Sequence, residues 1–322
     1  MAWNQYSGHT PILAQGRGQL NAIMKIVFSR KGFDSASGGA PSPIFPDGRL
    51  LSLPIPDRRS TICYKDIRWH EYNLGTIVSE LTRGRIHKAH RAHLDPDLYR
   101  KSLPRHRGWK PIFGQTGSAR GHLRNQGIRE GDVFLFFGLF QNVVCKGKGM
   151  IWDKRSQAHH IIWGWLQVGQ IVQVDTCDRK KLKWASYHPH LNRTPDPNNT
   201  LYIARKTLDL PVKMAKRQDG SGVFHRFSKK LRLTAPDAGS ASVWKLPKWF
   251  YPKDGRTPLS YHKDLSRWQR TDHATRLKTV SRGQEFVLDC EEYPEATRWL
   301  YGLLIGKWNL SLATSPAKFF WL

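Results

Sequence analysis

The sequence contains no long apolar run. No apolar stretch approaches the roughly 18 residues that a membrane-spanning helix requires. Residues 1–23 also lack the apolar centre of a secretory signal peptide. These absences argue against helical membrane spans and a secretory leader, so we expect a soluble, cytoplasmic protein. The first strongly apolar stretch begins at Met24, and we expect residues 1–23 to be an extension upstream of the true start.

Cysteine is scarce, and the cysteines that are present lie far apart. They are Cys63, Cys145, Cys177 and Cys290. No pair has the spacing of a zinc site or of a C-x-x-C redox motif. We therefore expect reduced, mostly buried thiols, as is usual in a cytoplasmic protein.

Acidic residues are few relative to basic ones. The chain has 25 Asp and Glu against 52 Lys and Arg, which gives a formal net charge of +27. A compact domain with such an excess repels itself unless a polyanion neutralises the charge, and nucleic acid is the commonest polyanion. A membrane surface would also attract this charge, but the chain offers no segment to insert. The expected partner is DNA, and the alternative is a basic enzyme without such a partner.

Internal repeats, low-complexity tracts and cofactor fingerprints are also missing. The absence of repeats argues against an array architecture. We find no motif for a dinucleotide, a nucleotide sugar, folate or a methyl donor, so no cofactor is expected. Aromatic residues, in contrast, are abundant: 13 Trp, 14 Phe and 10 Tyr among 322 residues argue against a disordered chain.

The hydrophobic pattern predicts an α+β fold without a regular βαβ alternation. Short β-branched or aromatic segments predict strands at residues 24–29, 60–64, 133–140, 160–174, 200–204, 230–234 and 285–288. Apolar spacing predicts helices at residues 74–82, 96–102, 118–126 and 294–304. Exposed insertions are expected at 192–199 and 232–242, and a surface loop at 244–270. We expect a mixed, mainly antiparallel sheet or small barrel with flanking helices, in one compact domain over residues 24–322.

A carboxylate beside a glycine-rich loop follows the first predicted strand. Asp34 lies close to Arg30, Lys31 and Gly32, and a Ser/Gly stretch follows it. A residue at the exit of a strand has rigid support and can approach a ligand. The alternative interpretation is an ordinary Asp-Ser turn.

Histidines and aspartates gather in residues 87–98, which include His93 and Asp95. These residue types suit several divalent ions, but their spacing is not a known ligand signature. Asp95-Pro96 also fits a simple helix start. We therefore expect a hydrogen-bonding cluster beside the substrate and no metal.

Two further segments combine polar groups with the start of a regular element. Gln115 lies in a loop that leads into the short helix expected at 118–126, which contains Arg120 and whose free N–H groups favour a phosphate. A capped helix without a ligand is the alternative. Arg282, Gln284 and Glu285 lead into an apolar strand, where a half-buried Glu is either an acid or base, or part of a structural ion pair.

Two aromatic strands could form the walls of a pocket for a planar base. Phe136 and Trp163 belong to glycine-containing aromatic runs, and rings of this kind stack on bases. Placement of most of these rings in the core is the alternative. Two imidazoles, His188 and His190, lie in a turn to which the pattern assigns no role.

Several short motifs occur in order along the chain. They are Lys31-Gly32-Phe33-Asp34-Ser35, Gly38-Gly39, Pro41-Ser42-Pro43, His93-Leu94-Asp95-Pro96-Asp97, Gly131-Asp132-Val133-Phe134-Leu135-Phe136-Phe137-Gly138, His188-Pro189-His190 and Arg282-Gly283-Gln284-Glu285-Phe286-Val287. This ordered set resembles the nucleotide-modification-associated domain families of bacteria, the third type in particular. Such proteins are similar to bacterial phage-defence DNA glycosylases that excise glucosylated hydroxymethylcytosine. The resemblance implies antiviral action on modified, double-stranded phage DNA, and it assigns neither a fold nor catalytic residues.

The leading hypothesis is a DNA glycosylase that hydrolyses the N-glycosidic bond of a hypermodified base and leaves an abasic site. Glycosylases turn the target nucleotide out of the duplex into a pocket. The bond breaks through an oxocarbenium-like sugar. A carboxylate can stabilise this cation or activate the water that attacks it. Asp34 is the expected catalytic carboxylate, with Glu285 in reserve.

The remaining candidate residues are assigned to the base or to the phosphates. Contacts to the base or its sugar are expected from His93, Asp95, Gln115, Gln284, Phe136 and Trp163. Phosphate contacts are expected from Arg30, Lys31, Arg120 and Arg282. One alternative is a non-catalytic reader of modified DNA. The other is an enzyme that installs a base modification, which would need a cofactor.

Overall fold

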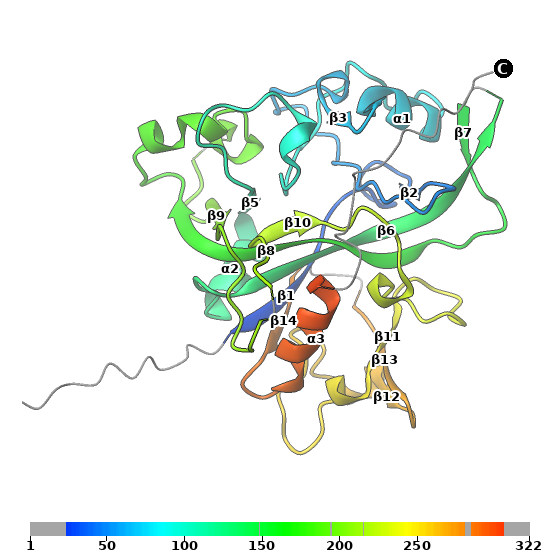
Figure 1. The fold of residues 1–322 in the computed structure, drawn as a ribbon, viewed down its shortest axis with the longest axis vertical. Coiled ribbons are helices and arrows are strands. Elements are labelled where there is room, and N and C mark those ends of the chain that lie inside the picture. Colours follow the sequence, from blue (N-terminus) through cyan, green and yellow to red (C-terminus); the bar gives the residue numbers. More distant parts are fainter. Residues whose placement is uncertain (1–23, 148, 194, 215, 281–284, 306–322) are drawn as a thin grey trace, which may run out of the picture.

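A long mixed sheet crosses the middle of the molecule (Figure 1). The structure is a computed structural model that describes residues 24–147, 149–193, 195–214, 216–280 and 285–305. The main path of the sheet is β14 (Glu285–Asp289), β1 (Lys25–Arg30), β6 (Val133–Lys146), β8 (His159–Gln173), β9 (Thr200–Ala204) and β5 (Ile112–Gln115). The shorter strands β2 (Ser42–Ile44) and β7 (Gly149–Trp152) pair with β6, and β10 (Ser221–Val223) pairs with β8.

Antiparallel pairs dominate this sheet. Only β1 with β6 and β2 with β6 are parallel among the strand pairs of the described residues. The sheet stays open, with β14 and β5 at the ends of its path, so it forms no barrel within the part of the chain that the structure describes. The described residues form one compact α+β domain, which confirms the mixed, mainly antiparallel sheet expected from the sequence.

The two faces of the sheet carry different layers. On one face, Phe28 packs against Trp244 of a second, three-stranded sheet, Phe250 of a 3₁₀ turn at Lys248–Phe250, and Trp299 of α3 (Glu295–Ile305). Figure 1 shows α3 and this small sheet together on that side. On the other face, Phe113 of β5 lies against the rings of Phe134 and Phe136.

Two smaller apolar clusters lie outside the main core. One surrounds α1 (Leu74–Leu81), whose buried residues recur at helical spacing and whose first turn is capped by Asn73. The other includes Ile112 of β5 and packs the segment around a 3₁₀ turn at Arg179–Ala185. α1 confirms the helix expected at 74–82, and α2 (Gly117–Asn125) and α3 confirm those expected at 118–126 and 294–304.

Three of the predicted elements are wrong. Residues 60–64 contain no strand and lead into a 3₁₀ turn at Tyr64–Asp66. Residues 230–234 overlap a 3₁₀ turn at Lys229–Leu231 and take part only in isolated bridges. Within 96–102 only Arg100–Ser102 is helical, because the backbone of Asp97 pairs with Ile112 instead of starting a helix.

The segment 244–270, expected to be a surface loop, builds most of the second sheet. This sheet consists of β11 (Val243–Pro247), β13 (Ala274–Lys278) and β12 (Trp268–Arg270), and the Trp244 side chain is fully buried. These strands are separated by loops along the chain, and whether each segment forms a strand depends on pairing with partners distant in sequence. The mixed polar and aromatic composition of residues 244–270 therefore gave no local signal for the core residues within this segment.

The structure also bears on two expectations from the sequence: mostly buried cysteines and the absence of membrane-spanning helices. The four cysteines carry free thiols; Cys290 is buried, Cys63 and Cys177 are half-buried, and Cys145 is exposed. The expectation of mostly buried thiols therefore holds fully for Cys290 alone. Within the described ranges, no helix combines the length and apolar character needed to cross a membrane.

His160 links the two sheets and predicts a pH-dependent stability. Its Nδ1 accepts a hydrogen bond from Trp244 Nε1 at 3.0 Å, and burial together with the charge of Arg30 lowers the pKa of His160 to about 3. An unfolded histidine has a pKa of about 6.5. Between that pH and the lower pKa of the folded state, the unfolded chain binds a proton at this residue and the folded chain does not. The free energy of unfolding should therefore fall by about 1.4 kcal/mol per pH unit from pH 6.5 towards pH 3 through this group.

Urea unfolding between pH 7 and pH 5 measures this effect. His160→Gln removes the titrating group, so its stability should depend less steeply on pH than that of the parent chain. Equal slopes for the two proteins would contradict the assignment.

Candidate functional site

Three of the residues singled out from the sequence meet at the start of β14. Glu285 is almost completely buried, and its Oε1 accepts hydrogen bonds from Lys31 Nζ at 3.0 Å and from Gln115 Nε2 at 2.5 Å. Its Oε2 is buried and has no hydrogen-bond partner among the described residues. We call Lys31, Gln115 and Glu285 the Glu285 cluster. A buried oxygen without a partner is costly, so it marks a place where a further group is expected to bind.

Strand pairing brings the Glu285 cluster together. β1 runs antiparallel to β14 with Ser29 opposite Glu285, so Lys31, just beyond β1, reaches the carboxylate. Gln115 is the last residue of β5, the strand at the other end of the sheet path, and its Nε2 reaches the same carboxylate. Lys31 Nζ also lies 5.0 Å from the centre of the Phe113 ring, which holds the ammonium by a cation–π contact.

A surface cavity of about 610 Å³ lies against β14, and the buried Glu285 is not among the residues that line it. Val287, which follows Glu285 at the strand period of two, lines it. Tyr261, another lining residue, is 46% exposed, and its backbone φ of 68° is rare for a bulky residue. The Tyr261 ring lies 4.3 Å from that of His122, between centroids. The cavity therefore has an aromatic rim.

The charges around this cavity are mixed. Lys25 and Lys263 line it together with three acidic residues, Asp264, Asp289 and Glu292. Burial lowers the pKa of His122, although the charge of Glu285 opposes this shift. Burial and the charge of Glu285 both raise the pKa of Tyr261. Both ring residues at the rim thus lie within the electrostatic reach of the Glu285 carboxylate.

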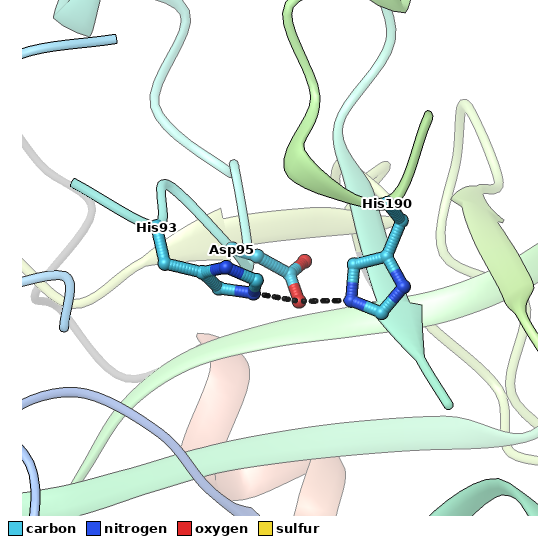
Figure 2. Close-up of side chains that lie close together, drawn as sticks. All are labelled: His93, Asp95 and His190. Carbon is cyan, nitrogen blue, oxygen red and sulfur yellow. Dashed lines mark ion pairs between the residues drawn. The ribbon is translucent and has the colours of Figure 1, made fainter. Parts of the chain in front are cut away.

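A second polar group combines residues from two distant segments (Figure 2). The Asp95 Oδ2 atom lies 3.7 Å from His93 Nε2 and 3.5 Å from His190 Nε2. We call His93, Asp95 and His190 the histidine–aspartate centre. One ligand atom from each residue lies within 4.8 Å of the other two, so the three could hold a metal ion.

Further hydrogen bonds orient each member of the centre. His93 Nδ1 bonds to Asp57 Oδ2 at 2.8 Å, and His190 Nδ1 bonds to Asn199 Oδ1 at 2.8 Å. The Gly114 N–H donates to Asp95 Oδ1 at 2.8 Å. A Cβ at Gly114 would lie 2.3 Å from the His190 ring, so only glycine lets the ring approach β5.

The pKa values in the centre follow from burial and from these contacts. Burial opposes the charged form of Asp95, but the neighbouring histidines, His188 first, hold its pKa well below the usual range. Burial also opposes protonation of His93, but the neighbouring carboxylates of Asp57 and Asp95 raise its pKa overall. For His190 burial prevails and its pKa is lowered.

Asp97 and Arg105 hold together the two segments that carry the centre. Arg105 donates from both terminal nitrogens to Asp97, at 2.6 and 2.7 Å, and also to Tyr187 Oη at 2.8 Å. Asp97 lies two residues after Asp95, and Tyr187 comes directly before His188. The Asp97 and Arg105 side chains are 0% and 4% exposed. This buried bidentate pair therefore positions the segment around residue 95 against the segment around residue 190.

The match to a known family agrees with the ordered motifs. Residues 25–289 match the family described as nucleotide modification associated domain 3. The chain belongs to this family. No curated protein and no solved structure matches the chain. Membership in the nucleotide modification associated domain 3 family supports a role on nucleotides or nucleic acid, and it assigns no reaction.

Asp34 occupies a turn in this family member. Its Oδ1 accepts hydrogen bonds from the N–H groups of Ala36 and Ser37, at 2.9 and 2.7 Å. This is the geometry of the ordinary Asp-Ser turn that the sequence left as the alternative. In the described residues, no hydrogen bond or ion pair joins Asp34 to the Glu285 cluster or to the histidine–aspartate centre.

The start of α2 is occupied by the chain's own carboxylate. Asp196 accepts a hydrogen bond from the Thr116 hydroxyl, and the Gly117 N–H also bonds to it. The phosphate expected at this helix start would compete with Asp196. Arg120 is buried within α2, and its Nε donates to Thr200 Oγ1 at 2.7 Å, so it is no surface phosphate ligand.

The aromatic candidates belong to the core. Phe136 is fully buried, which supports the alternative interpretation that these rings are core residues. Trp163 is nearly buried and donates from Nε1 to the Lys31 carbonyl at 3.3 Å. Arg30 ends β1 and lies near His160. Arg282 and Gln284 lie outside the described residues.

Several residues of the two sites were missed by the sequence interpretation. Asp57 and Asn199 lie in turns and carry no recognisable motif. The sequence shows the His188-Pro189-His190 turn, but its pattern indicates no role. A His-x-His pair is a usable signal only when a carboxylate is known to lie nearby, and here the carboxylate is Asp95, distant in sequence. Tyr261 gave no signal, because exposed tyrosines are common.

Proposed function

We propose that this protein is a DNA glycosylase that releases a hypermodified base, with glucosylated hydroxymethylcytosine of phage DNA as the candidate substrate and antiviral defence as its role. The observation that carries the proposal is the Glu285 carboxylate. One of its oxygens is held by Lys31 and Gln115, and the other is buried and has no hydrogen-bond partner among the residues that the structure describes. A positioned carboxylate with one free oxygen suits the oxocarbenium-like transition state of glycosidic cleavage.

Glu285 supports the catalytic role better than Asp34 does. The oxygen of Asp34 is used by two backbone N–H groups of its own turn. Glu285 is held by side chains from two other strands or their ends, so its direction is set before the substrate arrives. In this mechanism the free Oε2 stabilises the developing charge on the sugar or takes a proton from the attacking water.

The cavity against Val287 and Asp289 of β14 supplies features that nucleic-acid binding needs. Tyr261 is exposed and lies against the half-buried His122, so the pair offers aromatic surface on which a base can stack, and stacking is worth about 1–3 kcal/mol per base. Lys263 is exposed and available for a phosphate at the same rim, whereas Lys25 Nζ already contacts the Gln126 carbonyl at 2.7 Å and Asp289 at 3.6 Å. The excess of 52 basic over 25 acidic residues provides the general attraction to DNA.

A base-release assay tests the proposal. Phage DNA with glucosylated hydroxymethylcytosine, with unglucosylated hydroxymethylcytosine and with unmodified cytosine is incubated with the protein. We expect release of the glucosylated base, detected by mass spectrometry, and an equal number of abasic sites, detected by strand cleavage in alkali. Selective binding of the modified DNA without any released base would instead support a non-catalytic reader.

DNA binding should depend steeply on salt. Each neutralised phosphate contributes a slope of about −0.9 to the logarithm of affinity against the logarithm of salt concentration. If about six phosphates are contacted, affinity should fall by about 10³-fold between 50 and 200 mM salt. Fluorescence anisotropy with a labelled duplex measures this slope, and affinity that barely changes over the range would show that the net charge of +27 does not serve DNA binding.

A further inference from the structure

We propose that His93 Nε2, Asp95 Oδ2 and His190 Nε2 bind one divalent transition-metal ion, of the class to which Zn²⁺ belongs. This site is separate from the Glu285 cluster and does not rest on the proposed glycosylase activity. It differs from the expectation of no metal, which rested on the spacing of residues 87–98 alone. The ligands here come from two segments, residues 93–95 and residue 190, which only the fold brings together.

The hydrogen bond to Asp57 determines which nitrogen of His93 carries a proton. Asp57 Oδ2 lies 2.8 Å from His93 Nδ1, and a carboxylate oxygen can only accept. His93 Nδ1 therefore carries the hydrogen, and in the neutral ring Nε2 presents a lone pair towards Asp95 Oδ2 at 3.7 Å. A carboxylate behind the imidazole is the usual second partner of a metal-binding histidine.

The tautomer of His190 follows from the orientation of the Asn199 amide. Asn199 Nδ2 donates to the carbonyl oxygen of His190 at 2.8 Å, which fixes the amide nitrogen on that side. Its Oδ1 then accepts from His190 Nδ1 at 2.8 Å. His190 Nε2 is consequently a second lone-pair donor, and it faces the same oxygen of Asp95 at 3.5 Å.

With both imidazoles neutral, three lone-pair donors thus converge without a proton between them. The other oxygen of Asp95 is already engaged, because Oδ1 accepts from the Gly114 N–H and lies 3.2 Å from His188 Nε2. His188 Nδ1 accepts from the His190 N–H, so its Nε2 carries a hydrogen and it is not a ligand. Lone pairs that face one another repel in a buried site, and a cation between them removes the repulsion.

The distances and the ligand set fit a transition metal. Metal–ligand bonds of about 2.0–2.2 Å place tetrahedral ligand atoms about 3.4 Å apart. The two separations involving Asp95 are 3.5 and 3.7 Å, and all three lie within 4.8 Å. Imidazole nitrogens select zinc, iron, copper or nickel over magnesium or calcium, which prefer oxygen ligands. Three protein ligands also leave at least one coordination position for water or a substrate atom.

Metal titration of the full-length chain tests the site. Chelator-treated protein is titrated with Zn²⁺, with bound metal measured by elemental analysis after dialysis, and with Co²⁺, whose visible absorption reports nitrogen and oxygen ligands. We expect one ion per chain. His93→Gln should weaken binding at least 10-fold, and the matched control His87→Gln, an exposed histidine of the same segment, should bind as the parent does.

Asp57→Asn is the sharper variant, because Asp57 touches His93 and not the ion. The N–H of Arg59 donates to Asp57 Oδ1, so an asparagine there keeps its oxygen towards Arg59 and turns its NH₂ towards His93 Nδ1. The proton of His93 then moves to Nε2, and the lone pair is lost from the site. We expect metal affinity to fall about 10- to 100-fold while circular dichroism stays unchanged.

The outcomes separate metal binding from a purely structural role. If His93 is instead an imidazolium shared between Asp57 and Asp95, the parent chain will bind no stoichiometric metal. That result, or equal Zn²⁺ affinity of the parent, His93→Gln and Asp57→Asn chains, overturns the proposal. If His93→Gln fails to fold, Asp57→Asn decides. All metal measurements are made without DNA. A failure to release a base therefore does not contradict the metal site, and a failure to bind metal does not contradict the proposed glycosylase activity.

Discussion

Glu285→Gln is expected to lower the rate of base release by about 10²–10³-fold, the usual cost of losing one positioned electrostatic group. Gln keeps the size of the side chain, and its carbonyl oxygen can still accept the hydrogen bonds that Lys31 Nζ and Gln115 Nε2 now donate to Oε1. What is lost is the negative charge at Oε2, the oxygen that no described residue hydrogen-bonds. DNA affinity should stay the same or rise slightly, because a negative charge near phosphates is removed. Single-turnover release of the modified base and anisotropy on the same duplex measure both quantities.

Asp34→Asn is the matched control for this experiment. The amide oxygen of Asn can accept the same two backbone hydrogen bonds, from Ala36 and Ser37, so the turn and the activity should persist. The opposite pattern, with Asp34→Asn inactive and Glu285→Gln active, would return the catalytic role to Asp34. If both variants release the base at the parent rate, the site lies elsewhere in the chain.

Asp97→Ala is expected to lower the free energy of unfolding by about 3–5 kcal/mol, because it leaves the Arg105 guanidinium buried without its counter-charge. The bidentate contact is fully enclosed, and Trp109 and Tyr187 donate to the same carboxylate. Urea unfolding followed by tryptophan fluorescence measures the change.

Two control variants distinguish the loss of charge pairing from other effects. Asp97→Ala combined with Arg105→Met should recover part of the stability, because the unpaired charge is gone. Asp209→Ala removes an exposed ion pair with Arg205 and should cost less than about 1 kcal/mol. A change below about 1 kcal/mol for Asp97→Ala itself would contradict the structural role of the pair.

The sequence predicted the elements whose signal is local. α1, β9 and β14 lie where apolar spacing or β-branched runs placed them, within a residue at either end. Such patterns depend on neighbours a few positions away, so the local sequence is sufficient to predict these elements. The segment of β11 shows the limit of this approach, since Trp244 is buried by strands whose pairing depends on residues far along the chain.

The candidate residues show the same division. Composition and motif order were sufficient to indicate a nucleic-acid role and the family, and Glu285, Gln115, His93 and Asp95 were selected from the sequence by residue type and context. Only the tertiary structure joined Glu285 to Lys31 across 254 positions and to Gln115 across 170, and only it placed His190 beside Asp95. It also placed Asp196 at the start of α2, where a phosphate was expected. The physical reason is that residue type determines what a side chain can do, whereas strand register and loop packing determine which side chains meet.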